Sequence, residues 1–167
     1  SAPAPWPVPD AWRRQAADLL AGRGIDPARP FVAIHPGAGA QAKCWPLERF
    51  ANVASALRQA GTPAVLVLGP VELDRWGDSA TKPLGQQFPV VAGPDLPALA
   101  GLLSAAACYV GNDSGASHLA AAVGTPTVAL FAPTDPRHFR PLGRCVRVVA
   151  GATMEAIEVE QVLAEVT

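Results

Sequence analysis

Short apolar runs alternate along the chain with longer segments whose apolar residues recur at helical spacing. The runs predict strands over residues 31–35, 64–68, 89–92, 108–110, 127–131 and 146–149. The longer segments predict helices over residues 10–22, 46–60, 71–81, 96–106, 114–123 and 155–166. A loop rich in Pro and Arg over residues 132–143 takes the place of a helix after the fifth run.

This alternation favours a parallel sheet that is covered by helices on both faces and joined by right-handed crossovers. The predicted fold class is therefore α/β, a doubly wound Rossmann-like domain. In such sheets, ligands bind beyond the carboxyl ends of the strands. Five polar, glycine-containing loops are expected at this edge, over residues 36–44, 69–74, 93–95, 111–115 and 132–138.

The segment GNDSG at residues 111–115 connects a predicted buried strand to a predicted helix. The first N–H groups of a helix have no partner within the helix, and the helix dipole favours an anion there, such as a phosphate. Asp113 or Ser114 could instead serve as an ordinary N-cap residue. The position of this turn on the expected ligand edge favours a binding site over simple capping.

The loop over residues 36–44 has three interpretations. Its G-x-G-x-x-A pattern at residues 37–42 is compatible with dinucleotide binding, but the following Trp-Pro pair delays the helix that should open within the glycines. A G-x-x-x-x-G-K-[ST] phosphate loop would need a glycine at Ala42 and a hydroxyl at Cys44. The third interpretation is a flexible loop that presents Lys43 to a phosphate or a sugar, with an ordinary surface lysine as the alternative.

Composition excludes several classes of protein. The 167 residues are 50% hydrophobic and 16% charged, with 13 Lys and Arg against 14 Asp and Glu, so no overall field attracts nucleic acid or an anionic membrane. The three cysteines are widely spaced and form no disulfide or zinc pattern, which favours a reducing, cytoplasmic compartment. No apolar run approaches the roughly 18 residues of a membrane span.

Two other chemistries use residues of the same segments. A serine hydrolase would use Ser114 as nucleophile and His118 as base, but the G-x-x-S-G order is not a nucleophile elbow and no third orienting group is evident. His35, His118 and His138 could gather a metal ion, but no cysteine-rich or carboxylate-rich set accompanies them. The expected site therefore contains no metal, and the hydrolase is kept as an alternative of another class.

Residues 1–9 read SAPAPWPVP, and alternating prolines favour an extended, semi-rigid segment. This segment is predicted to be an interdomain linker. The sole methionine is Met154, so the sequence is expected to be a fragment of a longer protein.

Several motifs occur in order between residues 31 and 149: His35-Pro36-Gly37, Lys43-x-Trp45-Pro46, Leu68-Gly69 with Glu72, Asn112-Asp113-Ser114-Gly115-x-x-His118, and Pro133-Thr134-Asp135-Pro136. In combination they resemble glycosyltransferase family nine, the ADP-heptose:lipopolysaccharide heptosyltransferases. The resemblance implies that residues 10–167 are the nucleotide-sugar-binding domain, the C-terminal half of a two-domain GT-B enzyme whose N-terminal acceptor domain is absent from this sequence. It implies a transferase that moves heptose from ADP-heptose to the inner core of lipopolysaccharide.

The positions that line the family's ADP-sugar site match Lys43, Asp113, Ser114, Gly115 and His118, and Glu72 matches an acidic position on the nucleoside side. Asp113 has the wrong sign for a phosphate, so it is expected to contact sugar hydroxyls or to orient Lys43. The resemblance further implies no cofactor, no metal and a catalytic base in the N-terminal domain, so this chain alone is expected to be inactive. The expected partners are the ADP-sugar donor and, through the absent domain, a lipid A-core acceptor, with the full-length enzyme cytoplasmic and peripheral to the inner membrane. A nucleotide-binding module without transfer chemistry is the remaining alternative.

Overall fold

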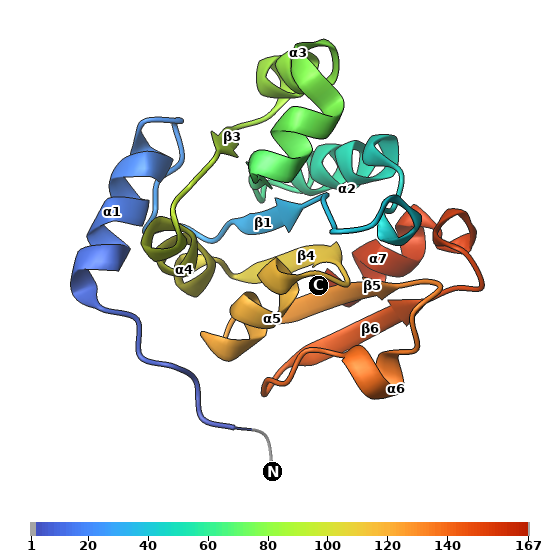
Figure 1. Cartoon of the computed structure of the whole chain (residues 1–167). Coiled ribbons are helices and arrows are strands. Elements are labelled where there is room, and N and C mark those ends of the chain that lie inside the picture. The colour runs from blue at the N-terminus through green and yellow to red at the C-terminus, as the bar shows by residue number, and fades with distance from the viewer. Residues whose placement is uncertain (1–2, 167) are drawn as a thin grey trace.

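Six parallel strands form one sheet in the order β3-β2-β1-β4-β5-β6 (Figure 1). The strands are β1 Val32–His35, β2 Ala64–Leu68, β3 Val90–Ala92, β4 Cys108–Asn112, β5 Thr127–Phe131 and β6 Val146–Ala150. The computed structural model describes residues 3–166. Its strand order is that of dinucleotide-binding domains, which confirms the predicted doubly wound α/β class.

Helices cover both faces of this sheet (Figure 1). They are α1 Asp10–Ala21, α2 Leu47–Gln59, α3 Pro70–Gln87, α4 Leu96–Ala105, α5 Gly115–Ala122, α6 Pro136–Phe139 and α7 Val159–Val166, with short 3-10 helices η1 Gln41–Lys43 and η2 Met154–Ala156. Successive strand residues face opposite sides, so Val32 and Ile34 pack toward α2 and α7 while Ala33 packs toward α1, α4 and α5. Two core clusters result, one on each face.

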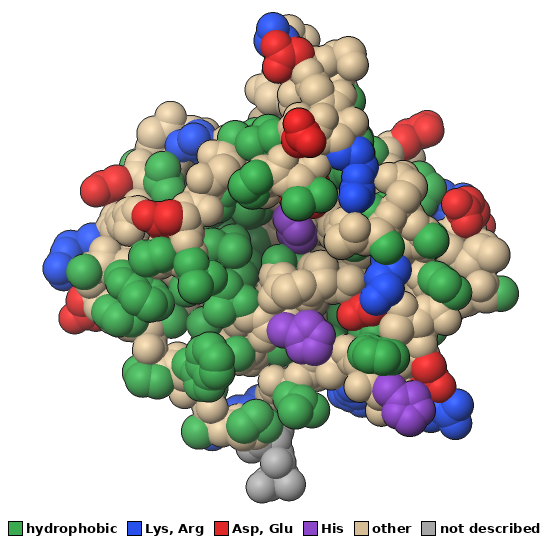
Figure 2. Space-filling view, in the orientation of Figure 1, with side chains coloured by type: hydrophobic (Ala, Val, Ile, Leu, Met, Phe, Trp, Pro, Cys, Tyr) green, Lys and Arg blue, Asp and Glu red, His purple; other side chains and the backbone are tan. Residues whose placement is uncertain are grey.

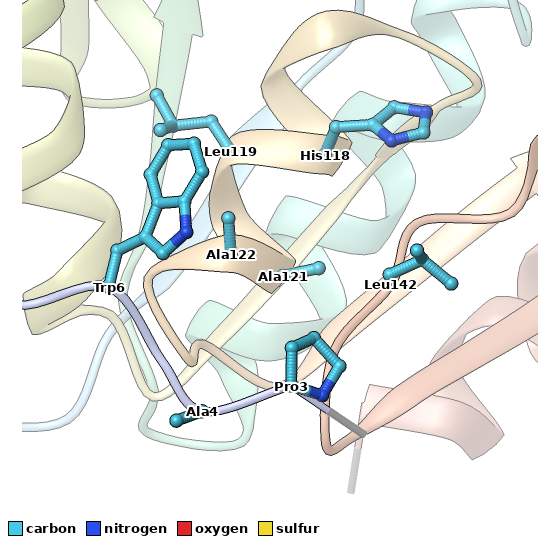
Figure 3. A pocket seen from close by; sticks show the side chains of 8 residues that line it. All are labelled: Pro3, Ala4, Trp6, His118, Leu119, Ala121, Ala122 and Leu142. Atoms are coloured by element: carbon cyan, nitrogen blue, oxygen red, sulfur yellow. The ribbon is translucent and has the colours of Figure 1, made fainter. Parts of the chain in front are cut away.

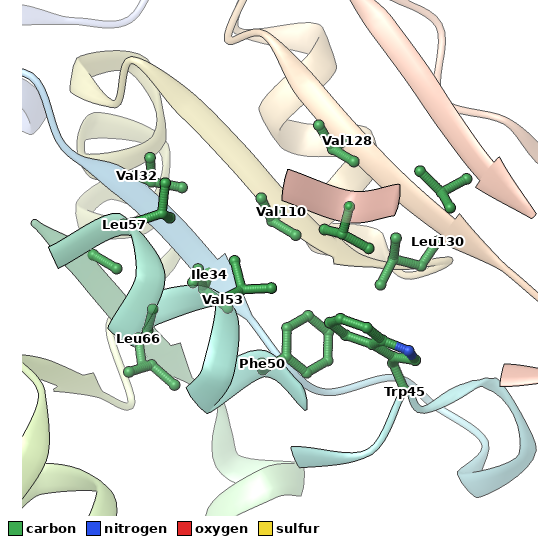
Figure 4. Packing of buried hydrophobic residues seen from close by; sticks show 14 of the residues in the cluster. Val32, Ile34, Trp45, Phe50, Val53, Leu57, Leu66, Val110, Val128 and Leu130 are labelled. Carbon is green, nitrogen blue, oxygen red and sulfur yellow. The ribbon is translucent and has the colours of Figure 1, made fainter. Parts of the chain in front are cut away.

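The cluster beneath α2 and α7 is built around Trp45 (Figure 4). The rings of Trp45 and Phe50 meet edge to face with centroids 4.9 Å apart, a favoured arrangement for aromatic pairs. The indole Nε1 donates to the carbonyl of Ile157 at 3.0 Å. This tryptophan therefore fastens the end of the loop after β1 to the C-terminal segment.

On the opposite face, α1 and α4 approach each other closely at Gly101. A Cβ atom at this position would overlap the backbone carbonyl oxygen of Trp12 in α1. The position therefore requires glycine because the two helix backbones leave no room for a side chain.

Several helices differ from the predicted ones. Helix α3 runs to Gln87 instead of ending near residue 81, with a kink at Gly77, whose φ of 61° is in the left-handed region. Residues 136–139 form α6 inside the expected loop, where Asp135 caps the turn by accepting from the Arg137 N–H at 2.9 Å. The helix predicted over residues 155–166 is confirmed only from Val159 to Val166, because the extended, fully buried Ile157 separates η2 from α7. Nowhere in residues 3–166 does a helix have the length and apolar character needed to cross a membrane.

The proline-rich N-terminal segment has no regular secondary structure from residue 3 to Pro9, but it is attached to the domain. The Trp6 N–H donates to the carbonyl of Ala122 at the end of α5, at 2.8 Å, and Val8 is buried. The segment thus leads along α5 into α1.

Candidate functional site

The sheet reverses its order at β1 and β4, the two central strands. The loop after β1 leads to α2 on one face, whereas the turn after β4 leads to α5 on the other. Such a divergence leaves a crevice beyond the carboxyl ends of the two strands, where doubly wound domains bind their ligands. Four of the six predicted site residues, Lys43, Asp113, Ser114 and Gly115, belong to these two connections.

Lys43 and Asp113 come together at this edge of the sheet. The Lys43 Nζ lies 2.8 Å from Asp113 Oδ2, with 34% of the lysine side chain and 8% of the aspartate side chain exposed. The ammonium also lies 5.9 Å from the ring centroid of Phe139 in α6, within the range of a cation–π contact. The expected orienting contact is thus present, and the lysine is held over the crevice instead of being a mobile surface cation.

Helix α5 begins two residues after Asp113 in the chain. Ser114 is the N-cap residue by backbone geometry, but its side chain makes no capping hydrogen bond, and the Asp113 carboxylate is bound to Lys43. Simple side-chain capping is therefore the wrong interpretation of this turn. Because the first helical N–H groups, beginning at Gly115, have no partner within the helix, they remain available to an anion beside the Lys43 ammonium.

Glu72 lies in the first turn of α3, where it is 3% exposed. Its Oε2 accepts a hydrogen bond from the Gly69 N–H at 2.8 Å. A Cβ atom at Gly37 would overlap the Glu72 carboxyl group, so the loop after β1 passes directly against this side chain. Glu72 therefore lies on the same rim as Lys43 and packs against the loop that carries this lysine.

Two residues of the site were missed from the sequence. Asn112 is fully buried, and its side chain hydrogen-bonds to both ends of the loop over residues 36–45. Arg75 of α3 donates to the carbonyl of Ala38 at 3.2 Å and approaches the Cys44 Sγ at 3.6 Å. Burial raises the pKa of the Cys44 thiol against the opposing effect of the Arg75 charge. Asn112 could have been found from its place in the GNDSG segment, whereas no motif identifies Arg75.

His118 lies one turn along α5, with its side chain exposed. It borders an apolar cavity of about 430 Å³ that also touches the N-terminal segment at Trp6 and the loop before β6 at Leu142. In Figure 3 the imidazole points away from Trp6. Lys43 and Asp113 do not line this cavity. His118 therefore belongs to α5, the helix that follows Asp113, but faces a different surface from the Lys43–Asp113 pair.

The surface near this cavity is largely apolar. Figure 2 shows hydrophobic side chains gathered over α4 and the N-terminal segment. Trp6, Leu96 and Leu142 are among the exposed large hydrophobic residues.

The geometry does not favour a serine nucleophile. Ser114 Oγ is buried and has no hydrogen-bond partner among residues 3–166, so it is not activated by His118. Across the same residues, no three His, Cys, Asp or Glu side chains are grouped so that they could hold a metal ion. An anion would instead meet the Lys43 ammonium and backbone N–H groups.

These features define a doubly wound α/β domain with the Lys43–Asp113 pair and an uncapped helix start at the reversal point of its sheet. The sequence model of glycosyltransferase family 9 (heptosyltransferase) matches residues 4–165. The chain belongs to this family, as its motifs predicted.

Curated and solved relatives agree with this assignment. The chain is 34% identical over 141 residues to lipopolysaccharide heptosyltransferase 3 of Escherichia coli K12, covering 79% of this chain and 38% of that protein. It superposes on a family 9 glycosyltransferase from Veillonella parvula with a TM-score of 0.83 and 25% identity, covering 96% of this chain and 52% of the other. For E. coli ADP-heptose lipopolysaccharide heptosyltransferase II the TM-score is 0.80 at 25% identity, with 96% and 51% covered. The chain thus spans about two fifths to one half of these relatives.

Proposed function

We propose that this domain binds an ADP-sugar, ADP-heptose, and forms the C-terminal half of a GT-B enzyme that transfers heptose to the inner core of lipopolysaccharide. The observation that carries the proposal is the Lys43–Asp113 pair, 2.8 Å apart, beside the uncapped start of α5. The name of the E. coli relative, an ADP-heptose heptosyltransferase, supplies the sugar nucleotide. On this proposal residues 1–9 are the interdomain linker and residues 10–167 the donor-binding domain.

The diphosphate of the donor is assigned to Lys43 and to the backbone N–H groups of Ser114 and Gly115. Charge-assisted hydrogen bonds of this kind each contribute about 1.5 to 3 kcal/mol, so two or three of them can hold a diphosphate without a divalent cation. As the bond between sugar and phosphate breaks, negative charge grows on the departing ADP. The same groups then stabilise that charge, which is electrostatic catalysis.

Asp113 cannot bind a phosphate because both are negative. Its carboxylate keeps the Lys43 ammonium over the crevice, and its remaining acceptor capacity suits a sugar hydroxyl. Glu72, a buried carboxylate on the adjacent part of the rim, is assigned to the nucleoside. His118, exposed on α5, is assigned to the sugar side of the donor.

Transfer also needs a base that removes a proton from the acceptor hydroxyl. We assign this base, and binding of the lipid A-core acceptor, to an N-terminal domain that is outside this sequence, so the chain alone binds the donor without transferring sugar. A cytoplasmic enzyme, peripheral to the inner membrane, is part of the same proposal. The cytoplasmic location is supported by the three free cysteines.

Calorimetric titration of the chain with ADP, UDP and GDP, with EDTA present, tests the proposal. We expect ADP to bind with micromolar to millimolar affinity, about 4 to 8 kcal/mol, and UDP and GDP to bind more weakly. Failure to bind ADP, or equal affinity for the three nucleotides, would contradict an ADP-sugar site.

A second assay tests whether the chain transfers sugar without an N-terminal domain. The chain is mixed with ADP-heptose and a lipid A-core acceptor, and release of ADP and formation of product are measured. We expect neither. Transfer by the chain alone, abolished by Asp113→Ala, would show that the base lies within these 167 residues.

A further inference from the structure

The Asn112 side chain contacts both ends of the loop that carries Lys43. Asn112 is the last residue of β4 and is 0% exposed. Its Nδ2 donates to the carbonyl oxygens of Pro36 and Gly37, at 3.0 and 3.2 Å. Its Oδ1 accepts from the backbone N–H of Trp45 at 3.0 Å. The Asn112 carboxamide thus bridges the two ends of the loop.

Between these attachment points the loop has the short helix η1 but no large side chain that would anchor it in the core. Its residues 38–44 read AGAQAKC and include no large apolar side chain. The indole of Trp45 is anchored in the core, and Arg75 holds the carbonyls of Ala38 and Gly39 from an exposed position. Asn112 is the fully buried side chain that connects this loop to the strand bearing the Asp113 turn.

The same residue also contacts α5. The Ser117 hydroxyl, in the first turn of α5, donates to the backbone carbonyl of Asn112 and lies 3.2 Å from the Tyr109 hydroxyl. Ser117 is fully buried. Asn112 therefore connects to the lysine loop through its side chain and to the start of α5 through its backbone, and its neighbour Asp113 pairs with Lys43.

We propose that Asn112 is a positioning residue for the diphosphate site: it holds Lys43 and the start of α5 at the separation that one diphosphate requires. The inference rests on the proposed function. Asn112 is itself buried and acts through Lys43. Only a neutral carboxamide supplies two donors and an acceptor in this space, since a carboxylate would face two carbonyl oxygens and a glutamine would be one methylene too long.

A double-mutant cycle with Lys43 tests this role through ADP affinity. We expect Asn112→Asp to weaken ADP binding at least tenfold in the unsubstituted chain, but less than twofold in the Lys43→Ala background, because no lysine is left to position. Independent effects that multiply, or wild-type affinity in Asn112→Asp, would overturn the proposal. Asn112→Ser, which buries no charge, replaces Asn112→Asp in the cycle if the latter does not fold.

Rescue by protonation separates positioning from a general defect. A buried aspartate takes up a proton more readily than an exposed one, and the neutral carboxyl again donates one hydrogen bond and accepts another. We expect the affinity deficit of Asn112→Asp, relative to the unsubstituted chain at the same pH, to shrink between pH 8 and pH 5.5. A deficit that is constant over this range contradicts the assigned hydrogen bonds.

Thr125→Val is the matched control for lost stability. Thr125 is buried, and its hydroxyl donates to the carbonyl of Leu103 at 2.6 Å, at the opposite end of the sheet from the rim. We expect this variant to melt at a lower temperature and to bind ADP within twofold of the unsubstituted chain. An affinity loss equal to that of the Asn112 variants would overturn positioning as their cause.

Hydrogen exchange separates failure of this inference from failure of the proposed function. If the unsubstituted chain does not bind ADP, the proposed function is wrong, but the attachment of the loop can still be measured. We expect Asn112→Ser to accelerate amide exchange at Trp45 and over residues 38–44, with exchange in β5 unchanged. Unchanged exchange in the loop would overturn the inference without any nucleotide.

Discussion

Two helices of this domain start on the same rim of the sheet, but a side chain caps the free N–H groups of only one of them. At α4 the carboxylate of Asp95 accepts from the Ala98 N–H at 2.9 Å, so the helix supplies its own cap. At α5 an aspartate also precedes the helix, but Asp113 is turned to Lys43 and no side chain caps the first turn. The same residue type thus completes one helix and leaves the other open to a ligand.

The two helices, α4 and α5, also differ in how they pack. Helix α4 lies directly against α1 through Gly101, whereas α5 begins at the crevice and has an exposed His118 in its first turns. Stability and binding are therefore expected to respond to different substitutions. The predictions below separate the two.

The largest expected effect is on stability, at the contact between α1 and α4. Gly101→Ala forces a methyl group into the backbone carbonyl of Trp12, which cannot move aside as a flexible side chain would. We expect the free energy of unfolding to fall by about 3 kcal/mol, measured by urea denaturation, with ADP affinity of the folded protein unchanged. Gly39→Ala is the control, since a Cβ there meets no atom within 4 Å. A normal stability for Gly101→Ala would contradict the close packing.

The next effect is on binding, at α5. Lys43→Ala removes the ammonium beside the helix start, and we expect ADP affinity to fall by about 1 to 3 kcal/mol, the scale of a lost charge-assisted contact. Lys82→Ala is the matched control because Lys82 also pairs with an aspartate, Asp78 at 2.9 Å, on the surface of α3. Calorimetry with and without EDTA measures both variants, and a loss of ADP binding on adding EDTA to the unsubstituted chain would contradict metal-free binding.

A third effect concerns pH and the strand beneath α5. Burial raises the pKa of the Cys108 thiol to about 11 and that of the Tyr109 phenol to about 12, from 9.0 and 10.0. Above pH 9 the unfolded chain loses these protons before the folded protein does, so the free energy of unfolding falls as pH rises. We expect a loss of about 1 to 2 kcal/mol between pH 8 and pH 10.

Urea denaturation across this pH range measures the loss. Cys108→Ala should make the dependence shallower. Equal slopes for the variant and the unsubstituted chain would mean that Cys108 ionises alike in the folded and unfolded states.

The smallest effect compares the two helix starts directly. Asp95→Ala removes a working cap and should lower the free energy of unfolding by about 1 kcal/mol. Ser114→Ala removes a hydroxyl that makes no capping bond, so we expect a change below about 0.5 kcal/mol. Thermal and urea denaturation measure the free energy of unfolding of both variants. Equal losses of stability would mean that the Ser114 hydroxyl does cap α5.

Most of the fold was predictable because its strands are short, apolar and separated by helical patterns. Val32 and Ile34 alternate with Ala33 between two buried faces, as a covered parallel sheet requires. The helix predicted over residues 155–166 begins only at Val159, because burial of Ile157 in the core, where its carbonyl accepts from Trp45 Nε1, overrides a local helical pattern. Local propensity carries no information about such a distant partner.

The site was predictable only in part, for the same reason. The GNDSG turn and Lys43 were identified because each lies after a strand and carries suitable chemistry. The hydrogen bonds of Asn112 to Pro36, and of Arg75 to Ala38, join positions 76 and 37 residues apart. Arg75 carries no local pattern that distinguishes a structural hydrogen-bond donor from an ordinary polar residue, and the GNDSG pattern, which includes Asn112, does not reveal the distant partners of that side chain.

The pairing of β1 with β4 also determines when the site can exist. Val32 pairs with Cys108 only after two further strands and three helices have been synthesised between them. Contacts so distant in sequence form late and make folding slow. Because Lys43 and Asp113 lie on opposite sides of that junction, their ion pair can form only when the two halves of the sheet join. A nascent chain that ends before β4 therefore contains Lys43 but lacks Asp113, its ion-pair partner.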